Sequence, residues 1–467
     1  MKHIFVFTTL LLTCAVAASA AESAYPPPPS SGQPVALDDT IYGVLRTHRA
    51  LRGLQENRNV LEHELDRARS GFGPRVDVTG QAGGGIQSDS SSRQQNLDRQ
   101  MWGVGSVSAT LVQPIWDGFA TRSRVRSAKS TLESVKSRVF DTATSLSLDG
   151  IIAHIDLLRR KVIYDLSENN VVQHKAVLAQ AQDRATLGAD TAVDVTQTES
   201  RLQRALSSLS EAKASLRVAE DTYLRLTGIS SNGSLAPVTM PPQLFDNPEA
   251  VYQLAEKFNP KLAAYLQDIR ALRGEQELAD AAFSPVINLE AGPSYSDRGG
   301  SRDRWIYSFD VLGTVRWNIF NSGGDWAERK AAAARIRQSR QVMYDYMDDL
   351  KLDIESTWIN YQAAQEQYKH YSKAIEYNQY TRTAYLEQFQ LGKRSLLDVL
   401  DSISELFNSS TQAETSRGNI LVGAYRLSAL TGNMLQQMSI NTGPLLGTKP
   451  PADPADSREE FAPGWFN

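Results

Sequence analysis

At 467 residues the chain is long enough for roughly two to four domains, and its composition, 41% hydrophobic and 22% charged, is that of a folded protein rather than a disordered or fibrous one. Its 53 acidic residues nearly balance its 49 basic residues. Nucleic acid is therefore not indicated as a partner, because phosphate binding favours a strongly basic face.

The N-terminal segment has the three parts of a secretory signal. Lys2 supplies the charge, residues 4–16 form a short apolar run, and residues 18–20 (Ala-Ser-Ala) form a small-residue cleavage site. We therefore expect residues 1–20 to be removed from the mature chain.

The only cysteine, Cys14, lies inside this apolar run, so attachment of a lipid is the alternative. Thr13 before it and the cleavage site after it favour ordinary processing. The following segment, 21–36, is rich in proline. No later stretch approaches the roughly 20 apolar residues that span a bilayer as a helix.

A short phrase recurs at a fixed spacing along the chain. "ATLGADTAVDVTQT" begins at residue 185 and "FQLGKRSLLDVLDS" at residue 389, so Gly188 and Gly392 are 204 residues apart (392 − 188). Such self-similarity predicts a duplicated architecture. The predicted parts are a first copy at 37–228, a linker at 229–247, a second copy at 248–432 and a tail at 433–467.

Each copy is predicted to contain a β-hairpin, over 74–113 in the first and 285–318 in the second. The clearest strand begins at Trp305 and ends at Trp317, with Tyr307 on the same apolar face. Alternation over about ten residues with aromatic residues at both ends is typical of a membrane β-strand, and these three aromatics are predicted to be interfacial. For the first hairpin, where 101–112 alternates poorly, an ordinary soluble hairpin remains the alternative.

Four strands cannot close a barrel, and unpaired strand edges are not tolerated in lipid. If these strands lie in a membrane, several chains must therefore share one barrel.

A long helix is predicted after each hairpin. Residues 117–187 and 325–391 contain no proline, so about 70 residues of continuous helix, on the order of 100 Å, are expected in each copy. Gly188 and Gly392 then separate these helices from shorter ones, which makes helical hairpins. Their mixed faces fit either a solvated coiled coil or the wall of a water-filled cylinder.

No catalytic constellation is found in the sequence. The six histidines (3, 48, 63, 154, 174, 370) include no pair at metal-ligand spacing, and there is no phosphate-binding Gly-Lys-Ser/Thr loop. We therefore predict no enzyme activity and no catalytic, cofactor-binding or metal-binding residues.

Two features resemble the TolC family of outer-membrane exit ducts, over residues 37–440. They are the duplicated order of two strands, a long helix, a glycine and a shorter helix, and the phrase "LGKRSLLDVLDSISELFNSS" (391–410). The resemblance implies a mainly α fold with a small membrane β-barrel part. In that fold a homotrimer shares one twelve-stranded barrel, and its helices form a periplasmic cylinder. The Gly188 and Gly392 turns would lie at the periplasmic entrance, and the expected location is the outer membrane with a long periplasmic portion.

The resemblance also implies a closed entrance held by links between helices. It assigns an aromatic latch to Phe389, with Asp194 as the partner, and an arginine latch to Arg394. Phe389 departs from the family pattern because it lacks the hydroxyl of the usual tyrosine. Val193 departs as well, since it stands where a hydroxyl residue would accept the arginine link.

Asp398 and Asp401 match the acidic rings of the family entrance. They are three residues apart on one predicted helix and therefore on one face, and in a trimer they would form two rings that favour cations. The alternative is that they are solvated surface carboxylates. The residues implied in adaptor docking are those of the two turns: Leu187, Gly188, Leu391 and Gly392.

These features predict a passive exit duct in a tripartite export machine, whose partners are a periplasmic adaptor and an inner-membrane ABC transporter or other pump. Type I protein secretion is favoured over multidrug or small-molecule efflux. The alternative from another class is a soluble periplasmic coiled-coil scaffold, which would have no use for two aromatic-ended β-hairpins.

Overall fold

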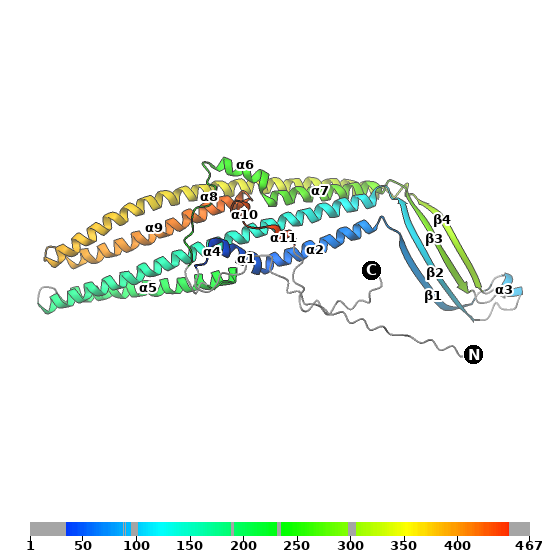
Figure 1. The fold of residues 1–467 in the computed structure, drawn as a ribbon. Helices are drawn as coiled ribbons and strands as arrows, with labels where there is room; N and C mark the ends of the chain where they lie inside the picture. The colour runs from blue at the N-terminus through cyan, green and yellow to red at the C-terminus, as the bar shows by residue number, and fades with distance from the viewer. Residues whose placement is uncertain are drawn as a thin grey trace.

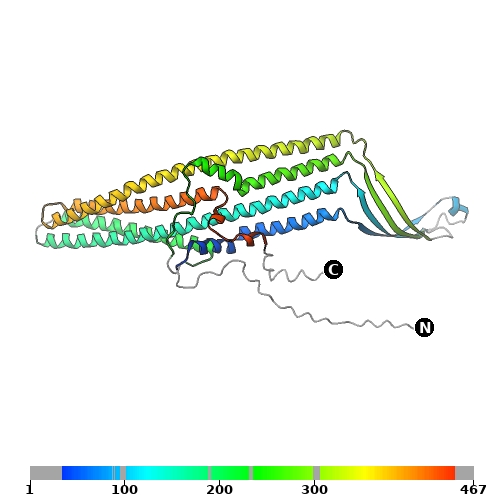
Figure 2. The ribbon, with the colours of Figure 1, turned by 45° about the horizontal axis from the view of Figure 1, so that its top comes forward.

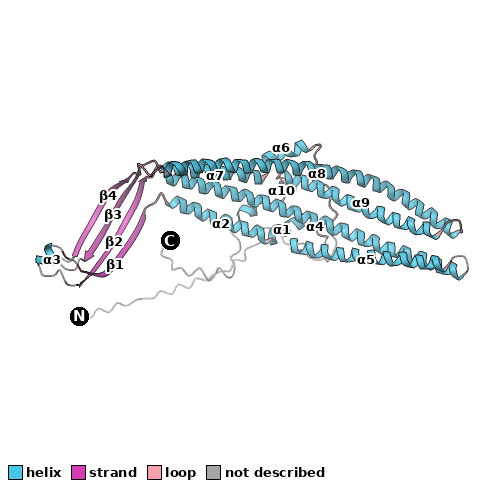
Figure 3. Cartoon of the chain, turned by 180° about the vertical axis from the view of Figure 1, so that it is seen from behind, coloured by secondary structure: helices cyan, strands magenta, loops and turns pink. Residues whose placement is uncertain are grey.

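The computed structural model describes residues 34–86, 88, 90–94, 101–187, 191–230, 235–297 and 305–447. A long bundle of helices carries a four-stranded sheet at one end and two helical turns at the other (Figures 1 and 3). The predicted signal segment, Cys14 and Gly188 lie outside the described residues.

The two copies follow the same order of elements. The first contains α1 (Leu37–Thr47), α2 (Arg49–Ser70), β1 (Arg75–Ile86), α3 (Ser90–Gln94), β2 (Met101–Trp116), α4 (Ala120–Thr186) and α5 (Ala192–Thr227). The second contains α6 (Pro248–Phe258), α7 (Pro260–Ala281), β3 (Val286–Asp297), β4 (Trp305–Arg316), α8 (Gly324–Gln390) and α9 (Leu396–Leu430), and is followed by α10 (Met434–Gln437) and α11 (Gly443–Gly447). The predicted fold class, mainly α with a duplicated plan of two strands and a long helical hairpin, is confirmed. Three short helices have no counterpart in the expectation: α3 lies between the two strands of the first hairpin, and α10 and α11 lie in the predicted tail.

The long helices α4 and α8 each have 67 residues, which corresponds to about 100 Å. Before each of these helices the chain reverses direction sharply as it leaves the sheet, and this turn contains residues in the left-handed backbone conformation. Gly118 has φ of +64°, and a Cβ there would lie 2.4 Å from the Cβ of Ser284, so only glycine fits this turn.

The helices lie side by side in a different order in the two halves of the body (Figure 2). Next to the sheet, α4 lies between α2 and α7, and α7 contacts α8. Beyond the middle, α4 contacts α5 and α9, and α9 contacts α8. The two long helices therefore run through both halves and connect the sheet to the turns.

The sheet is antiparallel in the order β1-β2-β3-β4, and its register separates an apolar from a polar face. Directly paired residues point to the same side of a sheet. One such row across the four strands is Val76, Leu111, Ala291 and Val311. Another row, on the opposite face, is Thr79, Ser108, Ser294 and Ser308. The strand β2 thus pairs on both sides although its sequence alternates poorly.

A core in the middle of the body joins α1, α4 and α9, with Ile41, Ile151 and Tyr425 among its buried residues. Beside it, the Oγ1 of Thr40 lies 2.8 Å from Nδ1 of buried His154, whose Nε2 lies 3.0 Å from the carbonyl oxygen of Ala236. Burial lowers the pKa of His154 below its usual value, so this histidine is held neutral. Among the described residues, no helix combines the length and apolarity that crossing a membrane would require.

Candidate entrance gate at the helical turns

The turn between α8 and α9 depends on the backbone of Gly392. Its φ is +69°, and the amides of Gly392 and Lys393 donate to the carbonyls of Phe389 and Gln388, each at 2.9 Å. No atom lies within 4 Å of where a Cβ would stand. Glycine is therefore favoured by the left-handed conformation and not by lack of space.

The recurring Asp of the two phrases is a helix-capping residue in both turns. The amide of Asp194 donates to the Oγ1 of Thr191, and the Thr191 amide and hydroxyl donate to the Asp194 carboxylate at 2.9 and 2.7 Å. In the second turn the amide of Asp398 donates to the Oγ of Ser395, which donates back to its carboxylate at 2.8 Å. Both aspartates thus stabilise the first turn of a returning helix, whose N-cap residue is Thr191 or Ser395.

Asp194 is engaged within its own turn. Hydrogen bonds from the Thr191 hydroxyl and then from its backbone amide lower the pKa of Asp194, so this carboxyl stays ionised. Its described contacts do not include Phe389, the partner that the family resemblance implies.

Phe389 is 2% exposed and packs in an apolar seam between the two helical hairpins. The seam joins α4, α8 and α9 and also contains Val177, Ala181, Leu396, Val399, Leu400 and Ile403. A phenyl ring offers no hydroxyl for a polar link, so burial is the contribution that this side chain can make to closure.

Arg184 of α4 reaches Phe389 from the other hairpin. Its guanidinium carbon lies 4.7 Å from the centre of the Phe389 ring, and Nη1 donates to the Phe389 carbonyl at 3.4 Å. A cation over an aromatic face adds attraction to the packing. The two hairpins are thus joined at this level by an arginine rather than by an aromatic hydroxyl.

Arg394 makes its contacts within its own hairpin. Its guanidinium carbon is 3.9 Å from the centre of the Tyr385 ring, and its Nε forms an ion pair with Oδ2 of Asp398 at 3.2 Å. The arginine is therefore attached to one of the two predicted ring aspartates.

Asp401 forms a direct ion pair between the two hairpins. Its Oδ1 lies 3.0 Å from Nη2 of Arg201, which belongs to α5. His174 of α4 is buried near this pair, and its pKa is lowered mainly by burial and further by the charge of Arg201. Each of the two predicted ring aspartates thus has an arginine beside it, one from its own helical hairpin and one from the other.

Two leucines are exposed among the described residues of the turns. Leu187 is 83% exposed and Leu391 is 70% exposed. Exposed leucines at both turns present an apolar surface at the far end of the body, as a docking site for another protein would require.

The predicted interfacial aromatics are exposed on the sheet. Tyr307 pairs with Tyr295, and Trp305 lies at the end of β4 farthest from the helices. Trp317 follows the other end of β4, where its Nε1 donates to the carbonyl of Phe283 at 3.1 Å. The three therefore mark the two ends of the strand.

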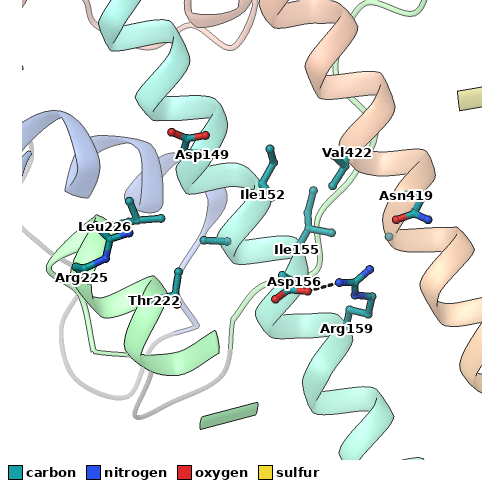
Figure 4. A pocket seen from close by; sticks show the side chains of 12 residues that line it. Asp149, Ile152, Ile155, Asp156, Arg159, Thr222, Arg225, Leu226, Asn419 and Val422 are labelled. Atoms are coloured by element: carbon teal, nitrogen blue, oxygen red, sulfur yellow. Dashed lines mark hydrogen bonds and ion pairs between the residues drawn. The ribbon is translucent and has the colours of Figure 1, made fainter. Parts of the chain in front are cut away.

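A hollow of about 420 Å³ lies in the middle of the body between α4, α5 and α9 (Figure 4). Asp156 and Arg159 form an ion pair with each other there, and Ile152 and Ile155 line the apolar part. Within the described part of the chain, no group of His, Cys, Asp or Glu side chains could hold a metal ion. This hollow offers no nucleophile and base in contact, so it does not compete with the turns as a functional site.

Three residues that contact the candidate gate residues were not identified from the sequence: Arg184, Arg201 and Tyr385. The helical pattern indicates which face of its own helix each occupies, but not which neighbouring helix that face meets. A weak signal exists for Arg201, which lies seven residues after Asp194 and therefore on the same face of α5.

The fold and a family model together define a class of protein: an outer-membrane channel with a long periplasmic helical portion. A family model described as outer membrane efflux protein matches residues 40–228 and 251–433, one segment in each copy of the repeat. The chain belongs to this family, as the resemblance to TolC-like ducts predicted.

Individual relatives agree with this assignment. The chain is 24% identical over 332 residues to the outer membrane efflux protein BepC of Brucella suis biovar 1 (strain 1330), which covers 71% of this chain and 73% of that protein. It is similar in fold to CusC, with a TM-score of 0.74 at 15% identity, covering 90% of this chain and 99% of that one. The Campylobacter jejuni CmeC outer membrane channel gives a TM-score of 0.73 at 13% identity, covering 85% of each chain.

Proposed function

We propose that three copies of this chain form the exit duct of a tripartite export machine. The observation that carries this proposal is the placement of both helical turns at the end of a body of about 100 Å opposite a sheet with one apolar and one polar face. The apolar face would meet lipid, and twelve strands from three chains would close a barrel that leaves no strand edge in the membrane.

The turns would form the periplasmic entrance, closed in its resting state. The contacts that support a closed state are the seam around Phe389, the Arg184 contact to it and the Arg201–Asp401 ion pair, all of which join the two hairpins of one chain. Separation of the hairpins would break these contacts. The exposed Leu187 and Leu391 would then be the surface on which a periplasmic adaptor docks.

The entrance would favour cations, but less strongly than two free rings of carboxylates. Asp398 is paired with Arg394, and Asp401 with Arg201, so much of the negative charge is compensated while these pairs persist. Opening of the hairpins would release Asp401 from Arg201 and increase the negative charge that a passing ion meets.

Protein export with an inner-membrane ABC transporter, as in type I secretion, is the cargo class we propose. Two sequence features support it: the phrase from Gly392 to Ser410, and a secretory signal in which ordinary cleavage is favoured over attachment of a lipid to Cys14. Small-molecule efflux is the second candidate, supported by the efflux name of the relative BepC.

Channel formation is tested by purifying the protein from outer membranes, determining its oligomeric mass and recording single channels in planar bilayers. We expect a trimer with a small cation-preferring conductance. A protein recovered from the periplasm as a soluble monomer would contradict the duct and support the scaffold alternative.

The two cargo classes are separated by deleting the gene and examining the culture supernatant together with drug sensitivity. Loss of a large secreted protein with unchanged drug sensitivity supports protein secretion. An unchanged supernatant with increased drug sensitivity supports efflux instead.

A further inference from the structure

A series of aromatic contacts shows which side of the helices next to the sheet is continuous with the apolar face of the sheet. Trp116 pairs with Ile287, which lies on the apolar face of the sheet. The rings of Trp116 and Phe119 are 4.7 Å apart, and the guanidinium carbon of Arg122 lies 6.0 Å from the centre of the Phe119 ring. The apolar face of the sheet therefore continues directly onto α4.

In the other copy of the repeat, a second series of contacts extends from the end of β4 onto α8. Trp317 donates to the carbonyl of Phe283, whose ring centre lies 5.1 Å from that of Trp326. The guanidinium carbon of Arg329 is 5.6 Å from the Trp326 ring centre. In both copies an aromatic residue is thus followed, one helical turn farther from the sheet, by an arginine on the same face.

A hollow of about 430 Å³ lies beside these contacts, lined by the turn that follows β2, by the start of α4 and by the end of α7. Its lining includes Phe119, Arg122, Arg126 and Ser284. We call this hollow, together with Trp326, Arg329 and Lys330 on the neighbouring α8, the junction site. The ends of α4, α7 and α8 that carry these residues are the ends next to the sheet (Figure 2).

The charges at the junction site favour an anion. Of its two carboxylates, Glu277 is paired with Arg126 and Asp280 with Arg329, the latter at 2.7 Å. Arg122 and Lys330 are exposed and have no carboxylate partner among the described residues. The site therefore presents two uncompensated cations.

The N-terminal parts of the two long helices are also positively charged over a longer stretch. Residues 117–138 and 320–340 together contain 11 Lys and Arg against 4 Asp and Glu, whereas the whole chain has a net charge of −4. Positive charge is thus concentrated where each long helix leaves the sheet.

We propose that the junction site binds the phosphate groups of anionic phospholipids in the periplasmic leaflet of the membrane. This inference rests on the proposed function, because it takes the apolar face of the sheet as the lipid face. Tryptophan and arginine are suited to the interface, where rings lie at headgroup level and guanidinium groups bind phosphate through paired hydrogen bonds.

Depth distinguishes this site from a general charge effect. Lys330 is six residues after the start of α8 at Gly324, or about 9 Å along the helix. Arg337 and Arg340 follow it on the same helix, about 10 and 15 Å farther from the sheet. Headgroups would reach the junction site but not these two arginines, which provide a matched control.

The test measures which lipid surrounds the full-length protein in vesicles. Brominated phosphatidylglycerol and brominated phosphatidylcholine each quench tryptophan fluorescence where they contact the protein, and their relative association constant gives the preference. We expect the wild type to prefer phosphatidylglycerol about fivefold or more, the factor expected from one or two basic residues near the headgroups. Arg122→Gln with Lys330→Gln should bring the preference close to one, and Arg337→Gln with Arg340→Gln should leave it unchanged.

Equal quenching by the two lipids in the wild type would overturn the inference and leave the duct intact. Equal loss of preference in both double variants would also overturn it, because the effect would then follow total charge and not position. Absence of quenching by either lipid would contradict the membrane placement itself, and thus the proposed function.

Discussion

Replacing Arg201 by glutamine removes the one ion pair described between α5 and α9 at the turns. The pair joins the two hairpins of a chain at 3.0 Å and compensates Asp401. The substitution keeps a polar side chain that can donate hydrogen bonds, but it shortens that side chain and removes the charge. We therefore expect an entrance that opens more often and prefers cations more strongly.

The size of the effect follows from the exposure of the two side chains, 29% for Arg201 and 58% for Asp401. An ion pair this exposed contributes about 0.5 kcal/mol. Three copies in a trimer give roughly 1.5 kcal/mol, which corresponds to about a tenfold change in the ratio of open to closed channels. Because the pair is screened by salt, the difference from wild type should shrink as ionic strength rises.

Single-channel recording in planar bilayers measures both quantities, the open probability directly and the cation preference from the reversal potential in a salt gradient. The matched control is Arg204→Gln, which removes the same charge one turn further along α5 from an exposed residue without a described partner. If the two variants have the same open probability and reversal potential, the Arg201–Asp401 pair does not hold the entrance.

Three further predictions concern the turns and the core. Replacing Asp398 and Asp401 together by alanine should weaken the cation preference, and a reversal potential equal to that of the wild type would remove both residues from the entrance. Gly392→Ala should destabilise the second turn by about 1 kcal/mol because its φ is +69°, whereas Gly53→Ala, at an exposed position inside α2, should be neutral or slightly stabilising; thermal unfolding of the two variants compares them. The folded-state pKa values of His154 and His174 lie below the ordinary value of 6.5, so the unfolded chain binds more protons and the free energy of unfolding should fall as pH falls through about 6.5. Denaturant titrations between pH 8 and about pH 5 should show a smaller fall for His154→Gln than for the wild type, and an identical pH dependence would contradict a buried neutral His154.

The elements that follow from local patterns were predictable from the sequence. Absence of proline between residues 117 and 187 indicated the length of α4, and the repeated phrase indicated both turns. The capping role of Asp194 and Asp398 also follows from local chemistry, since Thr191 and Ser395 each stand three residues earlier.

The lateral contacts were not predictable in this way. Helical periodicity places Arg201 on a face of α5, but which helix meets that face depends on how the two hairpins pack. The same is true of Arg184, which contacts a residue 205 positions away. The ion pair of Arg394, by contrast, was predictable. Asp398 stands four residues after it, and side chains at this spacing on a helix are neighbours.

Phe389 illustrates how a resemblance can indicate a place without indicating the chemistry. The family pattern points to this position as part of the closure between hairpins. With phenylalanine there, the structure buries the side chain in an apolar seam, and Arg184 supplies the polar contact from the other hairpin. The location of Phe389 beside the second turn follows from the repeated phrase, whereas its contacts depend on the atoms of this side chain.

Thiol modification of an Asp398→Cys variant determines whether the helical turns surround the entrance of a conducting pore. The sequence contains one other cysteine, Cys14, so the unmodified wild type serves as the control. We predict that a bulky thiol reagent added to the side of the turns reduces the single-channel current of the variant and leaves that of the wild type unchanged. A variant that is fully labelled and conducts as before would contradict the placement of the turns at the pore entrance.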